Sequence, residues 1–189
     1  MDQCSKYDNM CSVIKAANFA AIKHRKQKRK DIEETPYINH PIGPQCVANI
    51  LTSEGGICDP VVLQAALLHD TVEDTATTLE EIEEHFGAAV RNIVAEVTDD
   101  KSLPYGIRKQ MQIEKAKKCS YEAKLVKLAD KLYNLRDLQK STPIGWTNRR
   151  VEEYFLWAAE VVKNLQGTHS KLEDELKHVF SAQGIYLNN

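Results

Sequence analysis

One apolar segment that carries charged side chains constrains this chain more than any other feature. Residues 61–74 read VVLQAALLHDTVED, and the Asp59-Pro60 pair ahead of them is typical of a helix start, with Asp as the N-cap and Pro at the first helical position. At about 100° per residue, the apolar side chains of a helix over 60–75 point in nearly every direction. Such a helix needs neighbours on all sides, so we expect it at the centre of the fold.

That central helix also carries four titratable groups near its end, which are His69, Asp70, Glu73 and Asp74. His69 and Glu73 are i,i+4 neighbours, and so are Asp70 and Asp74. Buried carboxylates need hydrogen bonds, ion pairs or a metal ion, and three of them together need a cation. The alternative is that the helix end emerges into solvent, where charges are common. That alternative leaves the adjacent histidine and aspartate unexplained.

Most of the remaining chain also has the 3.6-residue periodicity of helices. Thr78-Leu-Glu-Glu81 is a capping box that opens a short helix, and Gly87 ends it. We predict helices over 11–28, 79–87, 88–98, 106–118, 122–140, 147–166 and 169–183, with irregular stretches at 31–44 and 99–105. The sequence therefore predicts an all-α bundle forming a single domain over 11–189, preceded by a flexible N-terminus at 1–10.

Composition excludes several classes of protein. The 189 residues have a formal net charge of −2, which argues against a nucleic-acid coat protein. The five cysteines are odd in number, widely spaced and without a CxxC pair, so we expect reduced thiols. No apolar run reaches the roughly 20 residues of a membrane span, and the N-terminus lacks the pattern of a signal peptide. We expect a soluble, cytoplasmic protein with no membrane contact and no obligate protein partner.

A second helix places one carboxylate at the border of the core. In the predicted helix 122–140, leucines form the apolar face, and Lys124, Lys127 and Lys131 are expected to face solvent. Asp130 lies between these faces, on a stripe with Asn134. Alone, such an aspartate is more often a structural hydrogen-bonding group than a metal ligand.

A third element is the string Tyr37-Ile-Asn-His40-Pro, in which His40 is expected in a turn just ahead of a helix. Together, His40, His69, Asp70 and Asp130 supply two imidazoles and two carboxylates. This mixture suits Mn²⁺, Fe²⁺ or Zn²⁺ better than Ca²⁺ or Mg²⁺. The order His, His-Asp, Asp is far more specific than any of its members.

These four residues resemble the signature of the HD-domain metal-dependent phosphohydrolases. The strings around them, ALLHDTVEDT at 66–75, VTDDK at 97–101 and KLADKLYNLR at 127–136, look like the hydrolase domain of RelA/SpoT proteins over about 13–185. Because no synthetase domain follows, the chain looks like the stand-alone metazoan SpoT homologues (Mesh type). That resemblance implies an HD-domain helical bundle with one Mn²⁺, which removes the 3′-pyrophosphate of the nucleotide (p)ppGpp.

The resemblance also assigns roles to Glu73 and Asp74, which activate or position the nucleophilic water in that family. General-base catalysis by either residue would contribute about 10²–10⁴-fold. The alternatives are an NADPH 2′-phosphatase with the same metal site, another HD phosphohydrolase that acts on deoxynucleotides, and a nucleotide sensor without turnover. An intact Glu-Asp pair argues against the sensor, which needs no water activator.

Residues on the substrate side are predicted less specifically. Six of the eight residues at 23–30 are Lys or Arg, which is either a solvated helix end or a phosphate-gathering patch. In the resembling family an Arg-Lys pair at the place of Arg29 and Lys30 contacts the nucleotide. Asn134 lies one turn after Asp130 and is a plausible sugar or phosphate contact.

The aromatic side of the predicted pocket comes from the helix 147–166 and the residue before it. Trp146, Arg150 and Tyr154 share one face at i,i+4 spacing, suited to the wall of a nucleotide pocket or to ordinary packing. Two features depart from the family pattern. Gly43–Cys46 looks a few residues longer, and Tyr105 stands where the animal branch is expected to have a basic residue.

Overall fold

The protein is all-α in a computed structural model that describes the backbone of residues 3–187 and the side chains of residues 8–187. The only β-type pairing in that part of the chain is one isolated bridge between Lys28 and Pro36. The helical elements in chain order are α1 (Gln3–His24), α2 (Asn39–Ile42), α3 (Val47–Asn49), the π-helix η1 (Ile50–Glu54), α4 (Pro60–Leu68), α5 (Thr71–Asp74), α6 (Leu79–Val97), α7 (Tyr105–Ala116), α8 (Tyr121–Lys140), α9 (Asn148–Lys163) and α10 (Ser170–Ser181). The predicted all-α fold is confirmed.

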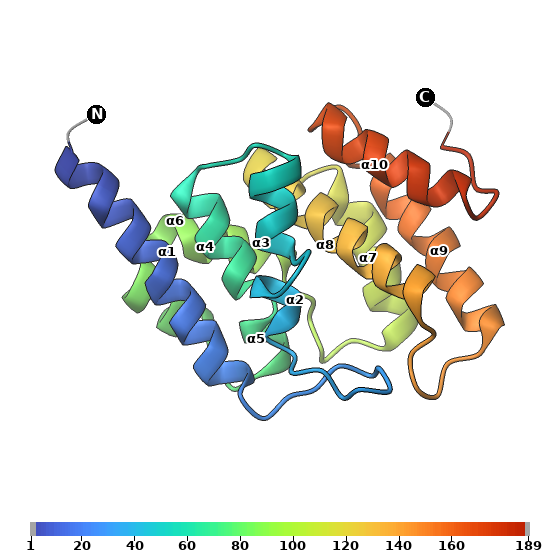
Figure 1. The fold of residues 1–189 in the computed structure, drawn as a ribbon, viewed down its shortest axis with the longest axis horizontal. Coiled ribbons are helices and arrows are strands. Elements are labelled where there is room, and N and C mark those ends of the chain that lie inside the picture. The colour runs from blue at the N-terminus through green and yellow to red at the C-terminus, as the bar shows by residue number, and fades with distance from the viewer. Residues whose placement is uncertain (1–2, 188–189) are drawn as a thin grey trace.

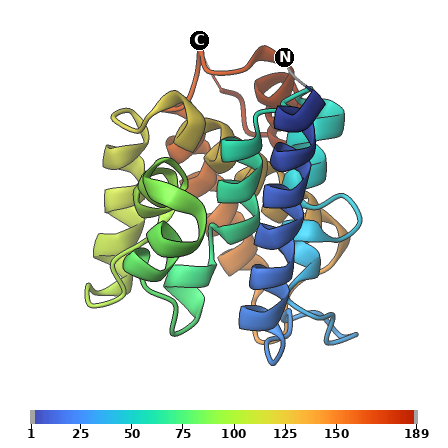
Figure 2. The same ribbon diagram turned by 90° about the vertical axis from the view of Figure 1, so that its left-hand side faces the viewer.

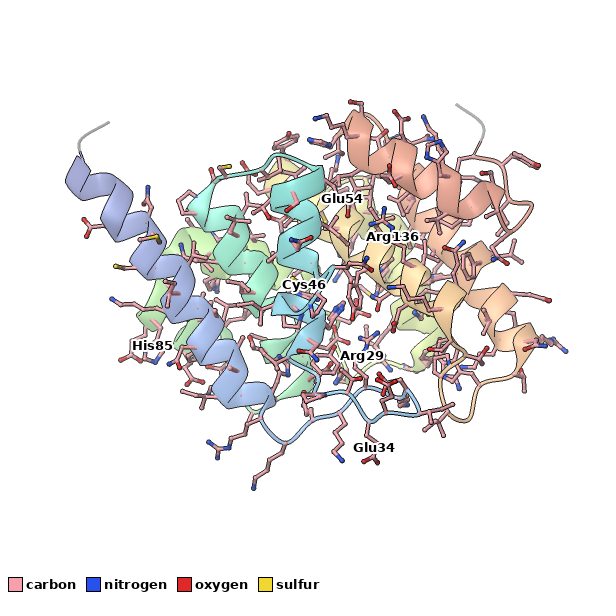
Figure 3. The ribbon with its side chains drawn as sticks, viewed as in Figure 1. Arg29, Glu34, Cys46, Glu54, His85 and Arg136 are labelled. Atoms are coloured by element: carbon pink, nitrogen blue, oxygen red, sulfur yellow. The ribbon has the colours of Figure 1, made fainter. Side chains whose placement is uncertain are left out.

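Helix α8 lies at the centre of the bundle (Figure 1). It contacts α3, η1, α4, α6, α9 and α10. The guanidinium of Arg136 on α8 binds Glu54 of η1 and Glu175 of α10, each with a shortest N–O distance of 2.7 Å, and Figure 3 shows Glu54 beside Arg136. Helix α4 is buried between α1, α6 and α8, as its apolar sequence predicted.

Helix α1 differs from its predicted bounds of 11–28 at both ends. It begins at Gln3, so the described part of the predicted flexible N-terminus at 1–10 is helical, while residues 1–2 and the side chain of Cys4 lie outside the described residues. It ends at His24 because the following backbone pairs with the segment before α2. Tyr37 N–H donates to the Gln27 carbonyl and Arg29 N–H to the Thr35 carbonyl, and these bonds replace helical ones.

The predicted helix 60–75 is interrupted at its histidine-aspartate pair. Helix α4 ends at Leu68 and α5 begins at Thr71. Local side-chain bonds compete for the helical carbonyls at this point, since His69 Nδ1 donates to the Ala66 carbonyl and the Thr71 hydroxyl to the Leu68 carbonyl. The break places His69 and Asp70 at the junction between the two helices.

The two helices predicted over 79–87 and 88–98 correspond to α6, whose two parts meet at a kink at Gly87. Gly87 has φ 83°, a conformation that favours glycine, so the predicted stop at this residue is correct. The Thr78 hydroxyl caps the helix by accepting from Glu81 N–H. The Glu81 carboxylate does not complete the capping box but binds Lys23 of α1 at 2.7 Å.

The segment after His40 folds into three short helical pieces that the sequence analysis did not resolve. His40 lies inside α2 and not in a turn ahead of a helix. Gly43 ends α2, and the Cys46 thiol caps α3 by accepting from Asn49 N–H, so the longer Gly43–Cys46 stretch forms the junction between two short helices. The described cysteines, Cys11, Cys46, Cys58 and Cys119, are free, as predicted.

Two loops lie together at one end of the bundle, the segment after α1 and the segment before α9 (Figures 1 and 2). The Ile144 N–H donates to the Lys30 carbonyl at 2.7 Å and joins them. Within the described residues, no helix is long and apolar enough to span a membrane.

The buried carboxylate of Glu173 fixes the start of α10 and provides a stability test. It accepts from the backbone N–H groups of Gly167, Thr168 and His169 at 2.8–3.1 Å. We expect Glu173→Ala to lower the free energy of unfolding by about 1–3 kcal/mol, because these donors lose their acceptor. Urea unfolding measures this loss. The exposed Glu84→Ala serves as the control, and an equal effect in both variants would contradict the assignment.

Candidate metal centre and nucleotide pocket

Four side chains from three parts of the chain converge at the centre of the molecule. His40 comes from α2, His69 and Asp70 from the junction of α4 and α5, and Asp130 from the middle of α8. The two Nε2 atoms lie 3.1 Å apart. Asp70 Oδ2 lies 3.0 Å from His69 Nε2 and 3.4 Å from His40 Nε2, and Asp130 Oδ1 lies 3.7 Å and 3.2 Å from the same two atoms.

These separations fit a divalent ion bound between the four atoms. Ligands at about 2.1 Å from an ion are about 3.0 Å apart at neighbouring octahedral positions and about 3.4 Å apart in a tetrahedron. The ligand atoms of His40, His69 and Asp130 all lie within 4.8 Å of one another, close enough for these three residues to share one ion. The hydrogen bond from His69 Nδ1 to the Ala66 carbonyl, at 2.7 Å, leaves Nε2 facing the other three ligand atoms. The donor set suits a transition metal.

Asp70, Asp130 and His69 have pKa values well away from their usual ranges. Burial alone would raise the pKa of Asp70, but His69 and His40 hold it well below its usual range. Burial likewise opposes the ionised form of Asp130, and Lys131 together with the two histidines lowers its pKa well below normal. Burial would lower the pKa of His69, whereas Asp70 and Asp130 raise it well above 6.5. Both carboxylates are therefore available as anions.

Glu73 and Asp74 lie beside this centre and line the same cavity of about 200 Å³. Burial raises the pKa of Glu73 to about 7; a bond from Asp99 N–H opposes the rise, and the nearby charges of Asp99, Asp70 and Asp74 add to it. Such a value is typical of a general base that works near neutral pH. Asp74 is held differently, because it forms an ion pair with Lys101.

Two lysines predicted to face solvent are buried here, and that prediction was wrong for both. Lys127 and Lys131 are 7% and 6% exposed, and Lys131 Nζ lies 2.7 Å from Asp130 Oδ2. Helix α9 contacts α8, and its Trp157 ring centroid lies 5.1 Å from Lys131 Nζ, which accounts for the burial of Lys131. Sequence analysis also missed Lys109 of α7, whose Nζ lies 3.3 Å from the ring centroid of Trp157. Burial and the charge of Lys131 lower the pKa of Lys109 to about 7.

A second cavity of about 310 Å³ opens next to the metal centre. Five of the six predicted substrate residues line it, namely Arg29, Lys30, Asn134, Trp146 and Tyr154. The sixth, Arg150, lines a neighbouring cavity of about 340 Å³ that shares Trp146 and Tyr154, and its guanidinium lies over the Trp146 ring at 4.3 Å. Tyr105 lines this neighbouring cavity and is 58% exposed.

Arg29 and Asn134 are both engaged with other protein groups. Arg29 forms a 2.6 Å ion pair with Asp137, and Figure 3 shows it inward of the exposed Glu34. The Asn134 amide donates to Asp130 Oδ1 at 2.7 Å. Asn134 and Tyr37 line both the 310 Å³ cavity and the metal cavity, so the two spaces adjoin.

Sequence analysis also missed the tyrosines around the centre. The Tyr37 hydroxyl donates to Asp70 Oδ2 at 2.5 Å, and the Tyr133 ring packs on His40 with centroids 4.6 Å apart. Burial, followed by the charge of Asp70, raises the pKa of Tyr37 far above its normal value, so its hydroxyl stays a donor. The position of Tyr37, three residues before His40, was the available signal.

This helical fold, with two histidines and two aspartates at its centre, defines an HD-domain protein. A scan against protein families agrees, because residues 16–159 match the family described as HD domain.

Individual proteins that resemble nearly the whole chain are named for a specific activity. The chain is 67% identical over 173 residues to "Guanosine-3′,5′-bis(diphosphate) 3′-pyrophosphohydrolase MESH1" of Xenopus tropicalis, covering 92% of this chain and 95% of that protein. It is 54% identical to the protein of the same name from Drosophila melanogaster, covering 91% and 94%. A solved structure described as "A metazoan ortholog of SpoT hydrolyzes ppGpp and plays a role in starvation responses" superposes with a TM-score of 0.89 at 53% identity, covering 92% and 96%. The chain therefore belongs to the HD-domain family and, within it, to the MESH1 group.

Proposed function

We propose that this protein hydrolyses the 3′-pyrophosphate of (p)ppGpp in a Mn²⁺-dependent reaction, giving GDP or GTP and pyrophosphate. The observation that carries the proposal is the convergence of His40, His69, Asp70 and Asp130 beside a cavity lined by basic and aromatic side chains. The activity named for relatives that match more than nine-tenths of the chain supports it.

The four converging residues would hold one metal ion. Two imidazoles and two carboxylates suit Mn²⁺, and the same set accepts Fe²⁺ or Zn²⁺. When bound, the ion lowers the pKa of a coordinated water and polarises the phosphoryl oxygens. The remaining chemistry belongs to the side chains around the ion.

Glu73 would take a proton from the attacking water, since its pKa of about 7 keeps a large fraction ionised and basic near neutral pH. The water oxygen bonds to the phosphorus next to the ribose, the bond from that phosphorus to O3′ breaks, and O3′ leaves as a hydroxyl after taking a proton from solvent. Asp74, which follows Glu73 in the chain, would position this water. The ammonium groups of Lys127 and Lys131, which line the same cavity, offset the negative charge of the pyrophosphate.

The adjoining cavity takes the nucleoside. Trp146 and Tyr154 offer aromatic walls, Asn134 offers an amide to the sugar or phosphate, and Lys30 offers charge at the mouth. Arg29 lines this cavity as well, and Arg150 would meet the nucleotide from the neighbouring cavity. The domain assignment, with one functional unit over 11–189 in the cytoplasm, forms part of the same proposal.

Product analysis tests the proposal. Purified protein loaded with Mn²⁺ is offered ppGpp and NADPH separately, and kcat/KM is compared. We expect GDP and pyrophosphate from ppGpp, and a loss of at least about 100-fold in Asp74→Asn if that residue positions the water. The exposed Asp100→Asn is the matched control. Preferred release of phosphate from NADPH would favour the 2′-phosphatase, and tight nucleotide binding without turnover would favour a sensor.

A further inference from the structure

Four side chains around the candidate metal centre neither hold the ion nor move a proton in the proposed reaction. They are Tyr37, Tyr133, Arg29 and Asp137. Two come from the segment between α1 and α2, and two come from α8. They join the nucleotide cavity to the side chains that would hold the ion.

Tyr37 contacts the metal centre through its hydroxyl and its ring. The hydroxyl donates to Asp70 Oδ2, the oxygen that faces both histidines. The ring packs edge-on against His40 with centroids 5.8 Å apart. A carboxylate held by a strong donor has one orientation available, and that orientation directs Oδ2 between the two imidazoles.

Tyr133 also packs against His40. Its ring centroid lies 4.6 Å from that of His40, so the imidazole contacts two aromatic rings. The Tyr133 hydroxyl makes no hydrogen bond within the described part of the chain, which leaves its ring as the contributing part. His40 Nδ1 is buried without a hydrogen-bond partner among the described residues, so ring packing holds its orientation.

Arg29 links the two tyrosines. Its guanidinium carbon lies 5.9 Å from the Tyr37 ring centroid and 5.2 Å from the Tyr133 ring centroid, within the range of cation–π attraction. The Asp137 carboxylate fixes the guanidinium at 2.6 Å, and Arg29 is half-buried there. A planar guanidinium can contact two rings at once, which an ammonium group does poorly.

We infer that Tyr37 is a positioning residue which orients Asp70 for metal binding, and that Arg29, anchored by Asp137, acts through Tyr37 as its clamp. Arg29 therefore has a role at the metal centre in addition to lining the nucleotide cavity. This inference rests on the proposed metal site and goes beyond it, because it assigns the metal affinity partly to residues that do not contact the ion.

The test measures Mn²⁺ affinity by calorimetric titration of the metal-free protein, together with the melting temperature of that metal-free form. Tyr37→Phe keeps the ring and removes the hydroxyl, and we expect the Mn²⁺ dissociation constant to rise about 10–100-fold. Tyr133→Phe is the matched control and should bind Mn²⁺ like the wild type. The melting temperature without metal should stay close to the wild-type value in both, which a merely structural role of the hydroxyl would not allow.

Arg29→Lys keeps the charge and loses the stacking on both rings. We expect its Mn²⁺ dissociation constant to rise by about tenfold or less, and the double variant with Tyr37→Phe to bind no more weakly than Tyr37→Phe alone. Independent effects that multiply in the double variant would overturn the action of Arg29 through Tyr37. Wild-type Mn²⁺ affinity in Tyr37→Phe would overturn the inference while leaving the proposed function intact. A wild-type protein that binds no metal would overturn both.

Discussion

Replacing Glu73 with glutamine is expected to lower turnover of ppGpp by the Mn²⁺-loaded protein about 10²–10⁴-fold, because the variant loses its base and little else. Glutamine has nearly the shape of glutamate, and its amide oxygen can still accept the bond from Asp99 N–H that holds the wild-type side chain at 3.0 Å. Mn²⁺ affinity and nucleotide affinity should change little. The exposed Glu84→Gln on α6 controls for the loss of one negative charge.

The same variant should be more stable than the wild type at high pH when no metal is bound. Burial raises the folded-state pKa of Glu73 from 4.5 to about 7, so folding favours its protonated form. The resulting stabilisation is complete below pH 4.5 and is lost as the pH rises through 7, since the carboxylate must then be buried as an anion. Allowing for partial exposure, Glu73→Gln should gain about 1–2 kcal/mol at pH 8 and nothing at pH 4.

Urea unfolding in a chelating buffer at the two pH values measures that difference. If Glu73→Gln loses turnover and gains stability at pH 8, the Glu73 carboxylate serves catalysis and destabilises the fold. Unchanged turnover would remove Glu73 from the mechanism, and lost turnover with lost stability at both pH values would point to a structural role.

Periodicity and capping residues predicted the long helices of this fold well. Helices α7, α8, α9 and α10 lie within a few residues of the predicted ranges, because their long sequences show helical periodicity. The short elements α2, α3 and η1 were not resolved, since three to five residues are too few for a periodic pattern. The break between α4 and α5 was missed because two local side-chain bonds produce it, and an apolar pattern does not encode them.

The metal ligands of the candidate site were predictable from the sequence, whereas the surroundings of the nearby lysine and arginine side chains were not. The spacing of His40, His69-Asp70 and Asp130 identified the four groups that the fold brings together, since motif and chemistry agreed. The burial of Lys131 was not predictable from α8 alone, because helix α9 covers that face. Arg29 was predicted as a nucleotide contact. Its ion pair with Asp137 was not predicted, because the two residues lie 108 positions apart in the chain.

Metal removal is expected to have the other large effect, on both turnover and stability. Chelation should reduce ppGpp hydrolysis to background, because Glu73 alone leaves the water and the phosphoryl oxygens without a Lewis acid. It should also destabilise the fold, because the proposed metal site forms only where α2, the α4–α5 junction and α8 meet. At a free Mn²⁺ concentration of 100 times the dissociation constant, binding adds about 2.7 kcal/mol. For a chain of this size that corresponds to a melting temperature higher by about 5–10 °C.

The isosteric Asp130→Asn separates metal binding from folding. Its amide can keep a hydrogen bond with Asn134, which donates to Oδ1 at 2.7 Å in the wild type, but it removes one of the two anions that face the histidines. We expect this variant to have no turnover and the same melting temperature with and without Mn²⁺, whereas Asp100→Asn behaves like the wild type. Hydrolysis that survives chelation, with no shift in melting temperature, would contradict a metal-dependent mechanism. The shift also reports the ion independently of substrate, so it distinguishes a protein that lacks its metal from one that has been offered the wrong nucleotide.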